Sequence, residues 1–313
     1  MTFFCLCMSP ALDASVTLPA WPADGVIFKD VAETENVGGK GINVARWLAL
    51  RGAEVSCGGL LGADNAAPFE QELARCGIGD AFLRVPGATR RNEMIVTPQG
   101  SFKLNRPAFP SLPADFDALA VLETGRGTRD ASLRSRGTLD PTLPHVAILS
   151  GSLPPAVPKD FYAAATRALK ARGWIVALDA SGEALRLGVE AGPDLIKPNA
   201  DECEPLVGFV PKSPDEFRRA TETLRAKAAH VIISDGGAGA WFDGEFTAAP
   251  KVEVLDTTSA GDTLLAEYCW RTWGCGASDA PMWAVAAGSA AVTMPGSVPP
   301  PIELVKQLKE NIK

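Results

Sequence analysis

The second half of the chain alternates short apolar runs with longer segments of helical composition. Residues 146–149, 174–178 and 230–234 are apolar or β-branched runs of strand length. Residues 158–172 and 215–229 lie between them, are rich in Ala and charged side chains, and are long enough for helices. Strands that alternate with helices in this order predict an α/β fold with a mostly parallel sheet flanked by helices.

Small or polar loops follow three of the predicted strands. They are residues 150–152 (SGS), 197–199 (KPN, after Leu195 and Ile196) and 235–237 (DGG). Ligands of parallel α/β sheets bind beyond the carboxyl ends of the strands. We therefore expect these loops to meet at one edge of the sheet and to line a site there.

The first third of the chain has a different pattern, which predicts a small separate sheet. Two strand-like runs flank residues 98–100 (PQG) and indicate a hairpin, and two shorter apolar runs precede them. The strands expected in this sheet are residues 16–18, 26–31, 93–97 and 101–105. Such a sheet suits a lid, with segments of about 13–35 and 87–108, in a single domain that spans residues 1–313.

The composition indicates an ordinary globular protein. Of the 313 residues, 46% are hydrophobic and 21% are charged, so a core needs neither disulfides nor metals. The net charge of −7 argues against nucleic acid or an anionic membrane as the main partner. The N-terminal segment lacks the basic region of a signal peptide, and no apolar run reaches the length of a bilayer span. We therefore expect a soluble, cytoplasmic protein.

The numbers and positions of the cysteines and histidines limit the kinds of catalytic or metal site that the chain can form. The seven cysteines are odd in number and form no C-x-x-C, which favours small buried side chains in a reducing compartment over a redox or metal role. The two histidines, His145 and His230, are far apart in strand-like contexts. This argues against a histidine metal site and against a Ser-His-Asp triad.

Two glycine-rich segments have the composition of loops that bind phosphate at the start of a helix. The first, residues 37–44 (VGGKGINV), precedes a predicted helix that Gly52 ends. Glycines let a ligand approach the backbone, free N–H groups favour anions, and Lys40 adds a positive charge. The spacing matches neither the dinucleotide fingerprint nor the P-loop, and a tight turn that serves packing explains this segment equally well.

The second segment, residues 257–262 (TTSAGD), precedes a predicted helix of residues 263–273. Small residues leave the first N–H groups of the helix open to charge that develops on a transferred phosphoryl group. Asp262 would then accept the proton of a substrate hydroxyl. The alternative is that Asp262 only complements the helix dipole.

Three further segments have both a functional and a structural interpretation. Asn199 and Glu202 stand at a predicted helix start, where they would either orient Mg²⁺ through water or form a capping box. Residues 236–239 (GGAG) would admit a nucleotide or form a tight turn. Residues 125–138 are basic and polar, which is typical of a surface loop. The alternative is that the arginines of this loop reach an anionic ligand: Arg126, Arg129, Arg134 and Arg136.

Six segments, taken in order, give the chain a family resemblance. They are residues 9–13 (SPALD), 38–46 (GGKGINVAR), 89–92 (TRRN), 150–155 (SGSLPP), 197–202 (KPNADE) and 256–262 (DTTSAGD). With these motifs the chain resembles the phosphofructokinase-B group of ribokinase-like sugar kinases over nearly its whole length. The likeness is strongest to the 1-phosphofructokinase and tagatose-6-phosphate kinase branch. The resemblance implies a three-layer sandwich with a β-sheet lid that is often a dimer interface, ATP and Mg²⁺ as cofactors, and a monovalent cation as a further candidate.

The resemblance also implies which residues contact the sugar. Asp13 matches an Asp that hydrogen-bonds sugar hydroxyls, and the loop around Lys40 matches the sugar-contacting loop. Arg90, or its neighbour Arg91, matches a clamp for a phosphate already present on the substrate. The implied substrate-binding residues are Asp13, Gly39, Lys40, Asn43, Arg90, Arg91 and Ser150.

For the reaction itself, the resemblance implies Asp262 as the base, with Asn199 and Glu202 governing Mg²⁺ through water. The implied ATP-binding residues are Lys197, Ser234, Gly236, Gly237 and Gly239, and the implied catalytic segment is Ser259, Ala260, Gly261 and Asp262. The family usually has Gly where this chain has Ser259. If that position needs a positive φ, serine costs about 1 kcal/mol or more.

A kinase of this kind moves the γ-phosphoryl group of ATP to a sugar hydroxyl in one in-line step. Lys40 and the two arginines favour a phosphorylated ketohexose, because a dianion suits forked, charged donors. We expect fructose 1-phosphate as the substrate and fructose 1,6-bisphosphate as the product. The alternatives are tagatose 6-phosphate, fructose 6-phosphate, and an unphosphorylated sugar or nucleoside. A different class of protein is also open, a catalytically silent sensor that binds a sugar phosphate.

Overall fold

The computed structural model describes residues 1–29, 31–113, 116–124 and 145–312, so residues 125–138 lie outside it. In the described part, a nine-stranded sheet has the order β13-β12-β11-β10-β9-β8-β1-β4-β5. The seven strands from β5 to β11 in that order run parallel, and β12 and β13 are antiparallel. The strands are β1 Thr2–Cys7, β4 Glu54–Gly62, β5 Gly79–Val85, β8 His145–Ser150, β9 Ile175–Asp179, β10 Leu195–Ile196, β11 His230–Ser234, β12 Gly239–Phe242 and β13 Glu245–Ala248.

The central strand β1 shows why the parallel strands are continuously apolar. All six of its residues are buried, because successive side chains point to opposite faces and both faces are covered. Phe3 and Cys5 pack into one apolar cluster, and Phe4 and Leu6 pack into the other. The predicted strands 146–149, 174–178 and 230–234 are confirmed as β8, β9 and β11.

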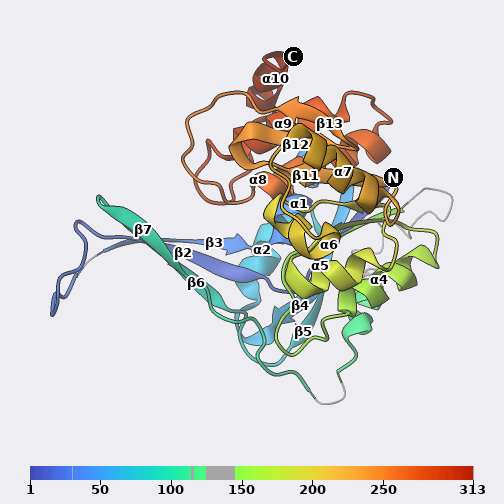
Figure 1. The fold of residues 1–313 in the computed structure, drawn as a ribbon. Helices are drawn as coiled ribbons and strands as arrows, with labels where there is room; N and C mark the ends of the chain where they lie inside the picture. Colours follow the sequence, from blue (N-terminus) through green and yellow to red (C-terminus); the bar gives the residue numbers. More distant parts are fainter. Residues whose placement is uncertain (30, 114–115, 125–144, 313) are drawn as a thin grey trace.

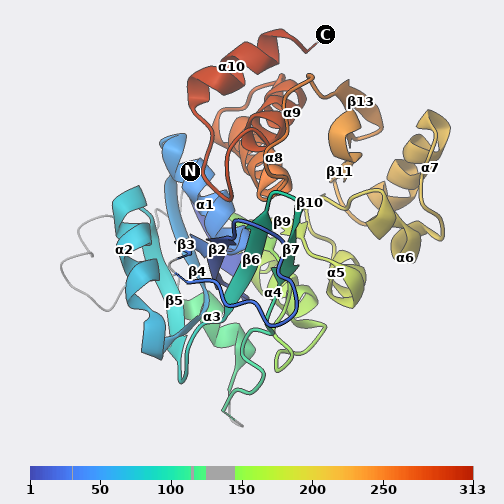
Figure 2. The same cartoon turned by 90° about the vertical axis from the view of Figure 1, so that its left-hand side faces the viewer.

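Helices form the two outer layers of the sandwich. Figures 1 and 2 show α8, α9 and α10 grouped on one side of the sheet and α4 and α5 on the other. The predicted helices 158–172 and 215–229 are confirmed as α4 and α7, and a π turn, Trp270–Gly274, follows α8. The helices are α1 Lys40–Leu50, α2 Ala67–Cys76, α3 Val121–Thr124, α4 Phe161–Lys170, α5 Gly182–Val189, α6 Glu204–Val207, α7 Pro214–Arg225, α8 Ala260–Cys269, α9 Ala280–Ala291 and α10 Ile302–Glu310.

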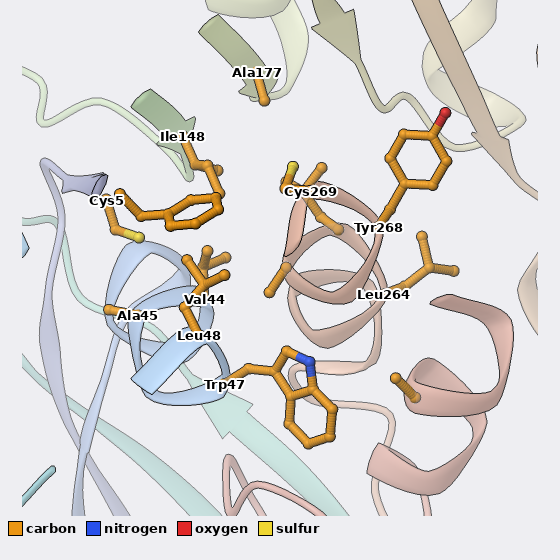
Figure 3. Packing of buried hydrophobic residues seen from close by; sticks show 14 of the residues in the cluster. Cys5, Val44, Ala45, Trp47, Leu48, Ile148, Ala177, Leu264, Tyr268 and Cys269 are labelled. Atoms are coloured by element: carbon orange, nitrogen blue, oxygen red, sulfur yellow. The ribbon is translucent and has the colours of Figure 1, made fainter. Parts of the chain in front are cut away.

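A buried charge network joins α1 to α8. Figure 3 shows the apolar part of this contact, in which Trp47 and Leu48 of α1 belong to the same buried cluster as Leu264 and Cys269 of α8. Glu267 of α8 is fully buried and accepts a hydrogen bond of 2.8 Å from the Trp47 indole. Two arginines, Arg51 and Arg271, each bring Nε to within 3.1 Å of the same carboxylate. The helix that carries Lys40 is thereby fixed to the helix that carries Asp262.

The first third of the chain forms a separate four-stranded sheet with the order β3-β2-β6-β7. Its strands are β2 Ala11–Thr17, β3 Ala32–Gly38, β6 Arg91–Thr97 and β7 Gly100–Leu104. The predicted hairpin is confirmed as β6 and β7, which pair antiparallel. Figure 1 shows this sheet extending away from the sandwich as a lid.

One predicted strand of the lid is wrong. Residues 26–29 and 31 are not in a strand, and the second strand in chain order is β3, immediately after them. Ile27 is 81% exposed, so its apolar character does not report a buried sheet face. The side chains of β3 are exposed up to Asn36, and the strand is held by its antiparallel ladder with β2 instead of by an apolar pattern.

The cysteines form no disulfide bonds with one another. All seven cysteines are free, and five of them, Cys5, Cys7, Cys57, Cys203 and Cys269, are buried. In the part of the chain that the structure describes, no helix has both the length and the apolar character needed to cross a membrane.

Candidate active site

Asp262 occupies the start of α8 and is 4% exposed. The first helical hydrogen bond runs from Thr263 N to Ser259 O (2.8 Å), so the N–H groups of residues 260–262 stand outside the helical ladder. The Asn43 amide donates to Asp262 Oδ2 at 2.8 Å. Burial raises the pKa of Asp262, and Lys40, Asn43 and other neighbours only partly offset this. A buried carboxylate with a raised pKa beside free N–H groups has the properties of a general base.

The turn before α8 contains a non-glycine residue in the left-handed region. Ser259 has φ 66° and ψ −3°, and its side chain makes no capping hydrogen bond. A positive φ at Ser259 was left open by the sequence, and the structure has it. Serine therefore has the conformational free-energy cost that glycine would avoid at this position.

A carboxylate that the sequence analysis missed lies beside the predicted lysines. Asp179, the last residue of β9, is 1% exposed. Its Oδ2 lies 3.1 Å from Lys40 Nζ and its Oδ1 lies 3.2 Å from Lys197 Nζ. Burial alone would raise the pKa of Asp179, but Lys197 and Lys40 hold it below its ordinary value. The sequence did contain one signal for Asp179, because it follows a predicted strand of the parallel sheet. The loops after the neighbouring strands were predicted to line the site on the same ground.

Glycine at two positions makes room for these charged groups. A Cβ at Gly261 would lie 3.3 Å from Lys197 Nζ, so the ammonium group sits against the first turn of α8. A Cβ at Gly38 would lie 1.9 Å from Asp13 Oδ2, so any other residue would displace that carboxylate from its position. Both glycines allow a polar group to approach the backbone closely.

The lid contributes Asp13 from β2. Its Oδ1 accepts a hydrogen bond of 2.9 Å from the Asn92 amide of the neighbouring strand β6. Burial raises the pKa of Asp13, with Asn92 and Arg90 acting in the opposite direction. The carboxylate is only partly buried, so it can accept hydrogen bonds from hydroxyl groups of a ligand.

The two predicted phosphate-clamp arginines have different surroundings. The Arg90 guanidinium donates to three backbone carbonyls, those of Ser9 (3.0 Å), Pro10 (3.4 Å) and Arg106 (2.9 Å). A guanidinium has five N–H donors, so donors remain for a ligand. Arg91 points to the surface of the lid, where three glutamates bind it: Glu33, Glu35 (2.9 Å) and Glu93 (2.7 Å).

Ser150 stands at the same edge of the sheet as Asp179. The two residues are partners in the parallel ladder of β8 and β9, and Cys7 of β1 is the partner of Ser150 on its other side. Ser150 is 1% exposed, and its hydroxyl has no hydrogen-bond partner among the residues that the structure describes. A buried hydroxyl without a partner is costly, which suits a polar ligand at this edge.

The predicted nucleotide side is built from turns. Asn199 Oδ1 accepts from Glu202 N (2.9 Å) and Glu202 Oε2 accepts from Asn199 N (3.0 Å), so the capping-box interpretation is confirmed. Ser234 and Asn199 form an isolated parallel β-bridge. Residues Gly236–Ala238 form one 3₁₀ turn between the antiparallel strands β11 and β12, which confirms the tight turn. Gly236 and Gly237 are exposed and Gly239 is buried.

A metal ion would find few protein ligands at this edge. Within the described ranges, no three His, Cys, Asp or Glu side chains gather as ligands. The donor set of Asn199 and Glu202 fits Mg²⁺, which keeps much of its water and is often bound by one or two carboxylates together with substrate phosphates.

A sequence model of the family described as pfkB family carbohydrate kinase matches residues 17–104 and 144–302. The chain belongs to this family. The 1-phosphofructokinase of Rhodobacter capsulatus is 36% identical over 266 residues, which cover 83% of this chain and 80% of that protein. The 1-phosphofructokinase of Escherichia coli K12 is 34% identical over 233 residues, or 72% of this chain and 70% of that protein.

Solved structures agree with the fold of this pfkB kinase. Phosphofructokinase-2 from Escherichia coli in complex with substrates and products superposes with a TM-score of 0.85 and 25% identity, covering 99% of each chain. A possible 1-phosphofructokinase from Thermotoga maritima has a TM-score of 0.77 at 22% identity, covering 100% of this chain and 98% of that one, and supports the fold alone. The expected three-layer kinase fold is thereby confirmed.

A second residue that sequence reasoning missed is Lys103 on the lid strand β7. Its Nζ lies 2.9 Å from Thr258 Oγ1, in the turn just before α8. This contact joins the lid to the catalytic turn across the site. No motif in the sequence marks Lys103, because the strand that carries it is exposed along its whole length.

Proposed function

We propose that this kinase transfers the γ-phosphoryl group of ATP to fructose 1-phosphate and forms fructose 1,6-bisphosphate. The observation that carries the proposal is that the buried carboxylate of Asp262, the ammonium of Lys40 and the free N–H groups at the start of α8 belong to one site. Asp13 adds an acceptor for sugar hydroxyls from the lid. The names of the relatives from Rhodobacter capsulatus and Escherichia coli support the choice of substrate.

In the proposed mechanism, Asp262 accepts the proton of a primary hydroxyl of the sugar. The hydroxyl oxygen forms a bond to the γ-phosphorus while the bond from that phosphorus to the ADP oxygen breaks. The N–H groups of Ala260 and Gly261, with the Lys197 ammonium beside them, neutralise the charge on the transferred group. Ser234, Gly236, Gly237 and Gly239 would hold ATP, and lid closure would exclude water from the reaction.

Mg²⁺ is part of the proposal. Asn199 and Glu202 would orient it through water, and a bound Mg²⁺ neutralises charge on the nucleotide phosphates. A monovalent cation is a second proposed requirement, which the potassium complex of Escherichia coli phosphofructokinase-2 supports.

On the substrate side, we propose that Lys40 and Arg90 bind the phosphate already present on the sugar. Arg91, held by three glutamates of the lid, serves as the matched control. We expect Arg90→Ala to raise KM for the sugar phosphate at least tenfold and Arg91→Ala to change it little. An Arg90→Ala variant with an unchanged KM would refute the clamp.

The assembly proposal concerns the lid. We infer that residues 1–313 form one kinase domain and that the lid is a subdomain of it. We further propose that the enzyme is cytoplasmic and that the lid is the contact surface of a homodimer. Large apolar side chains on the lid support the contact, since Trp21 is 50% and Phe102 37% exposed and their rings lie 5.6 Å apart. A tetrameric inhibited form is described for Escherichia coli phosphofructokinase-2, so the measured mass in solution decides between dimer and tetramer.

The function is tested with the purified protein, Mg·ATP, and a panel of sugars and sugar phosphates in an ADP-release assay. We expect the highest kcat/KM for fructose 1-phosphate, and a loss of about 10²–10⁴-fold in kcat for Asp262→Asn. A higher kcat/KM for tagatose 6-phosphate, fructose 6-phosphate or an unphosphorylated sugar would show that the proposed substrate is wrong. The assignment as a sugar kinase would still hold. Absence of turnover with every compound, combined with binding of a sugar phosphate, would instead favour the sensor.

A further inference from the structure

Asp179 makes contacts that its neighbours in the sheet do not make. It is the last residue of β9 and is 1% exposed, and each of its oxygens faces a different lysine. Lys40 comes from the start of α1, and Lys197 follows β10. One buried carboxylate therefore joins the loop proposed for the sugar to the lysine proposed for the nucleotide phosphates.

The two lysines differ in what they present to a ligand. The Lys40 side chain is 45% exposed, so Asp179 holds one side of the ammonium group while the rest faces open space. The Lys197 side chain is 6% exposed and lies against Gly261. An ammonium group has three N–H donors, so each lysine keeps donors for a phosphate after its bond to Asp179.

Without a fixed partner, neither ammonium group would have a defined position. A lysine side chain has about 2 kcal/mol of rotamer entropy, and a point charge on a flexible chain does not stay in one geometry. A buried carboxylate in turn needs partners, because an unpaired buried charge is strongly unfavourable. The pairs at 3.1 and 3.2 Å meet both requirements.

Asp179 also lies close enough to Asp262 to act on its titration. The groups that face Asp262 are Lys40 and Asn43 from α1, Asp179 from β9 and Lys197 after β10. Burial and the negative charge of Asp179 raise the pKa of Asp262, whereas the lysines and Asn43 lower it. Neutralising Asp179 would therefore lower the pKa of Asp262.

We propose that Asp179 is a positioning residue for phosphoryl transfer, which holds Lys40 toward the phosphate of the sugar and Lys197 toward the transferred group. The inference rests on the proposed function, because it assigns the two lysines to the two phosphates of that reaction. In this proposal Asp179 itself touches neither the sugar nor the nucleotide: it holds the two lysines by direct contact and acts on Asp262 through its charge.

The test compares Asp179→Asn with Asp194→Asn as a matched control. Asp194 is also paired with a lysine, Lys170 at 2.7 Å, and accepts a backbone hydrogen bond from β9, but it makes none of the contacts of the site. For Asp179→Asn we expect kcat to fall about 100-fold, the loss typical of a 1 Å misplacement, and KM to rise for both substrates. We also expect the acid limb of the kcat/KM profile to move to lower pH. For Asp194→Asn, all three quantities should match those of the parent.

A second variant separates position from charge and guards against a failure to fold. Asp179→Glu keeps the charge and both ion pairs but is one methylene longer, so it should lower kcat without moving the acid limb. A parent-like kcat in either variant, or an acid limb that stays in place in a folded Asp179→Asn, would overturn the proposal. The parent substrate is determined first, and all variants are measured with it. If the parent enzyme prefers a different sugar phosphate, the proposed substrate is wrong. The role of Asp179 is then tested with that substrate in the same way.

Discussion

Replacing Ser259 with glycine tests the turn before Asp262, where a non-glycine residue adopts a left-handed conformation. Ser259 caps α8 with φ 66°, and its hydroxyl makes no hydrogen bond to the helix. The substitution therefore removes backbone strain without removing a cap. We expect Ser259→Gly to stabilise the folded protein.

The size of the effect follows from two opposing contributions. An L-residue in the left-handed region costs about 1–2 kcal/mol. Glycine makes the unfolded chain more flexible, which offsets about 0.4–1 kcal/mol of the gain. The expected net increase in the free energy of unfolding then lies between about 0 and 1.6 kcal/mol, with a central value of about 0.8 kcal/mol.

The chain contains a matched control for this measurement. Ser181 caps α5, also without a side-chain hydrogen bond, but with φ −137°. Ser181→Gly keeps the cost of glycine in the unfolded chain and relieves no strain, so it should be slightly destabilising. In urea unfolding, Ser259→Gly should exceed Ser181→Gly by about 1–2 kcal/mol, the cost of the left-handed conformation. Equal free energies of unfolding for the two variants would refute the strain argument.

Three further predictions concern the groups around this turn. Glu267→Gln removes the buried carboxylate that pairs with two partly buried arginines, so the free energy of unfolding in urea should fall by about 3–5 kcal/mol; a loss below 1 kcal/mol would contradict the network. Asn43→Ala removes a hydrogen bond that lowers the pKa of Asp262. Since the base acts deprotonated, the acid limb of kcat/KM should move to higher pH, and a shift to lower pH would contradict its role. Lys103→Met breaks the contact between the lid and Thr258, so ADP release without sugar should rise relative to transfer; an unchanged ratio would argue against a closing role.

The buried strands could be predicted because a strand that is covered on both faces consists almost entirely of apolar residues. β8 and β9 are almost wholly buried, so each is a continuous apolar run. β3 was missed because five of its seven residues are exposed and its ladder with β2 uses backbone groups that every sequence has. The apolar run just before it was misleading, since Ile27 faces solvent.

The site was predictable only as far as motifs mark it. Asp262, Lys40 and Asn43 stand in glycine-rich helix starts, and the structure brings them together. Asp179 sits at a strand end without any local signature, and its importance appears only when two lysines from distant segments meet it. Arg90 and Arg91 are adjacent in sequence, but Arg90 precedes β6 and Arg91 is its first residue, and their side chains have different partners, which a motif alone does not separate.

The charge balance of this cluster explains how an acidic protein can carry out chemistry on two phosphates. Lys40 and Lys197 contribute two positive charges, and Asp179 and Asp262 contribute two negative charges, so the cluster is neutral before reaction. In the proposed mechanism Asp262 takes the proton of the hydroxyl, so its charge disappears and the cluster becomes positive by one unit. This occurs as negative charge spreads over the transferred phosphoryl oxygens, where positive groups stabilise it most. A permanent excess of positive charge would bind substrate and product phosphates more tightly without favouring the transition state. The charge of Asp179 therefore matters as well as its position, because that charge keeps the cluster neutral until the proton moves.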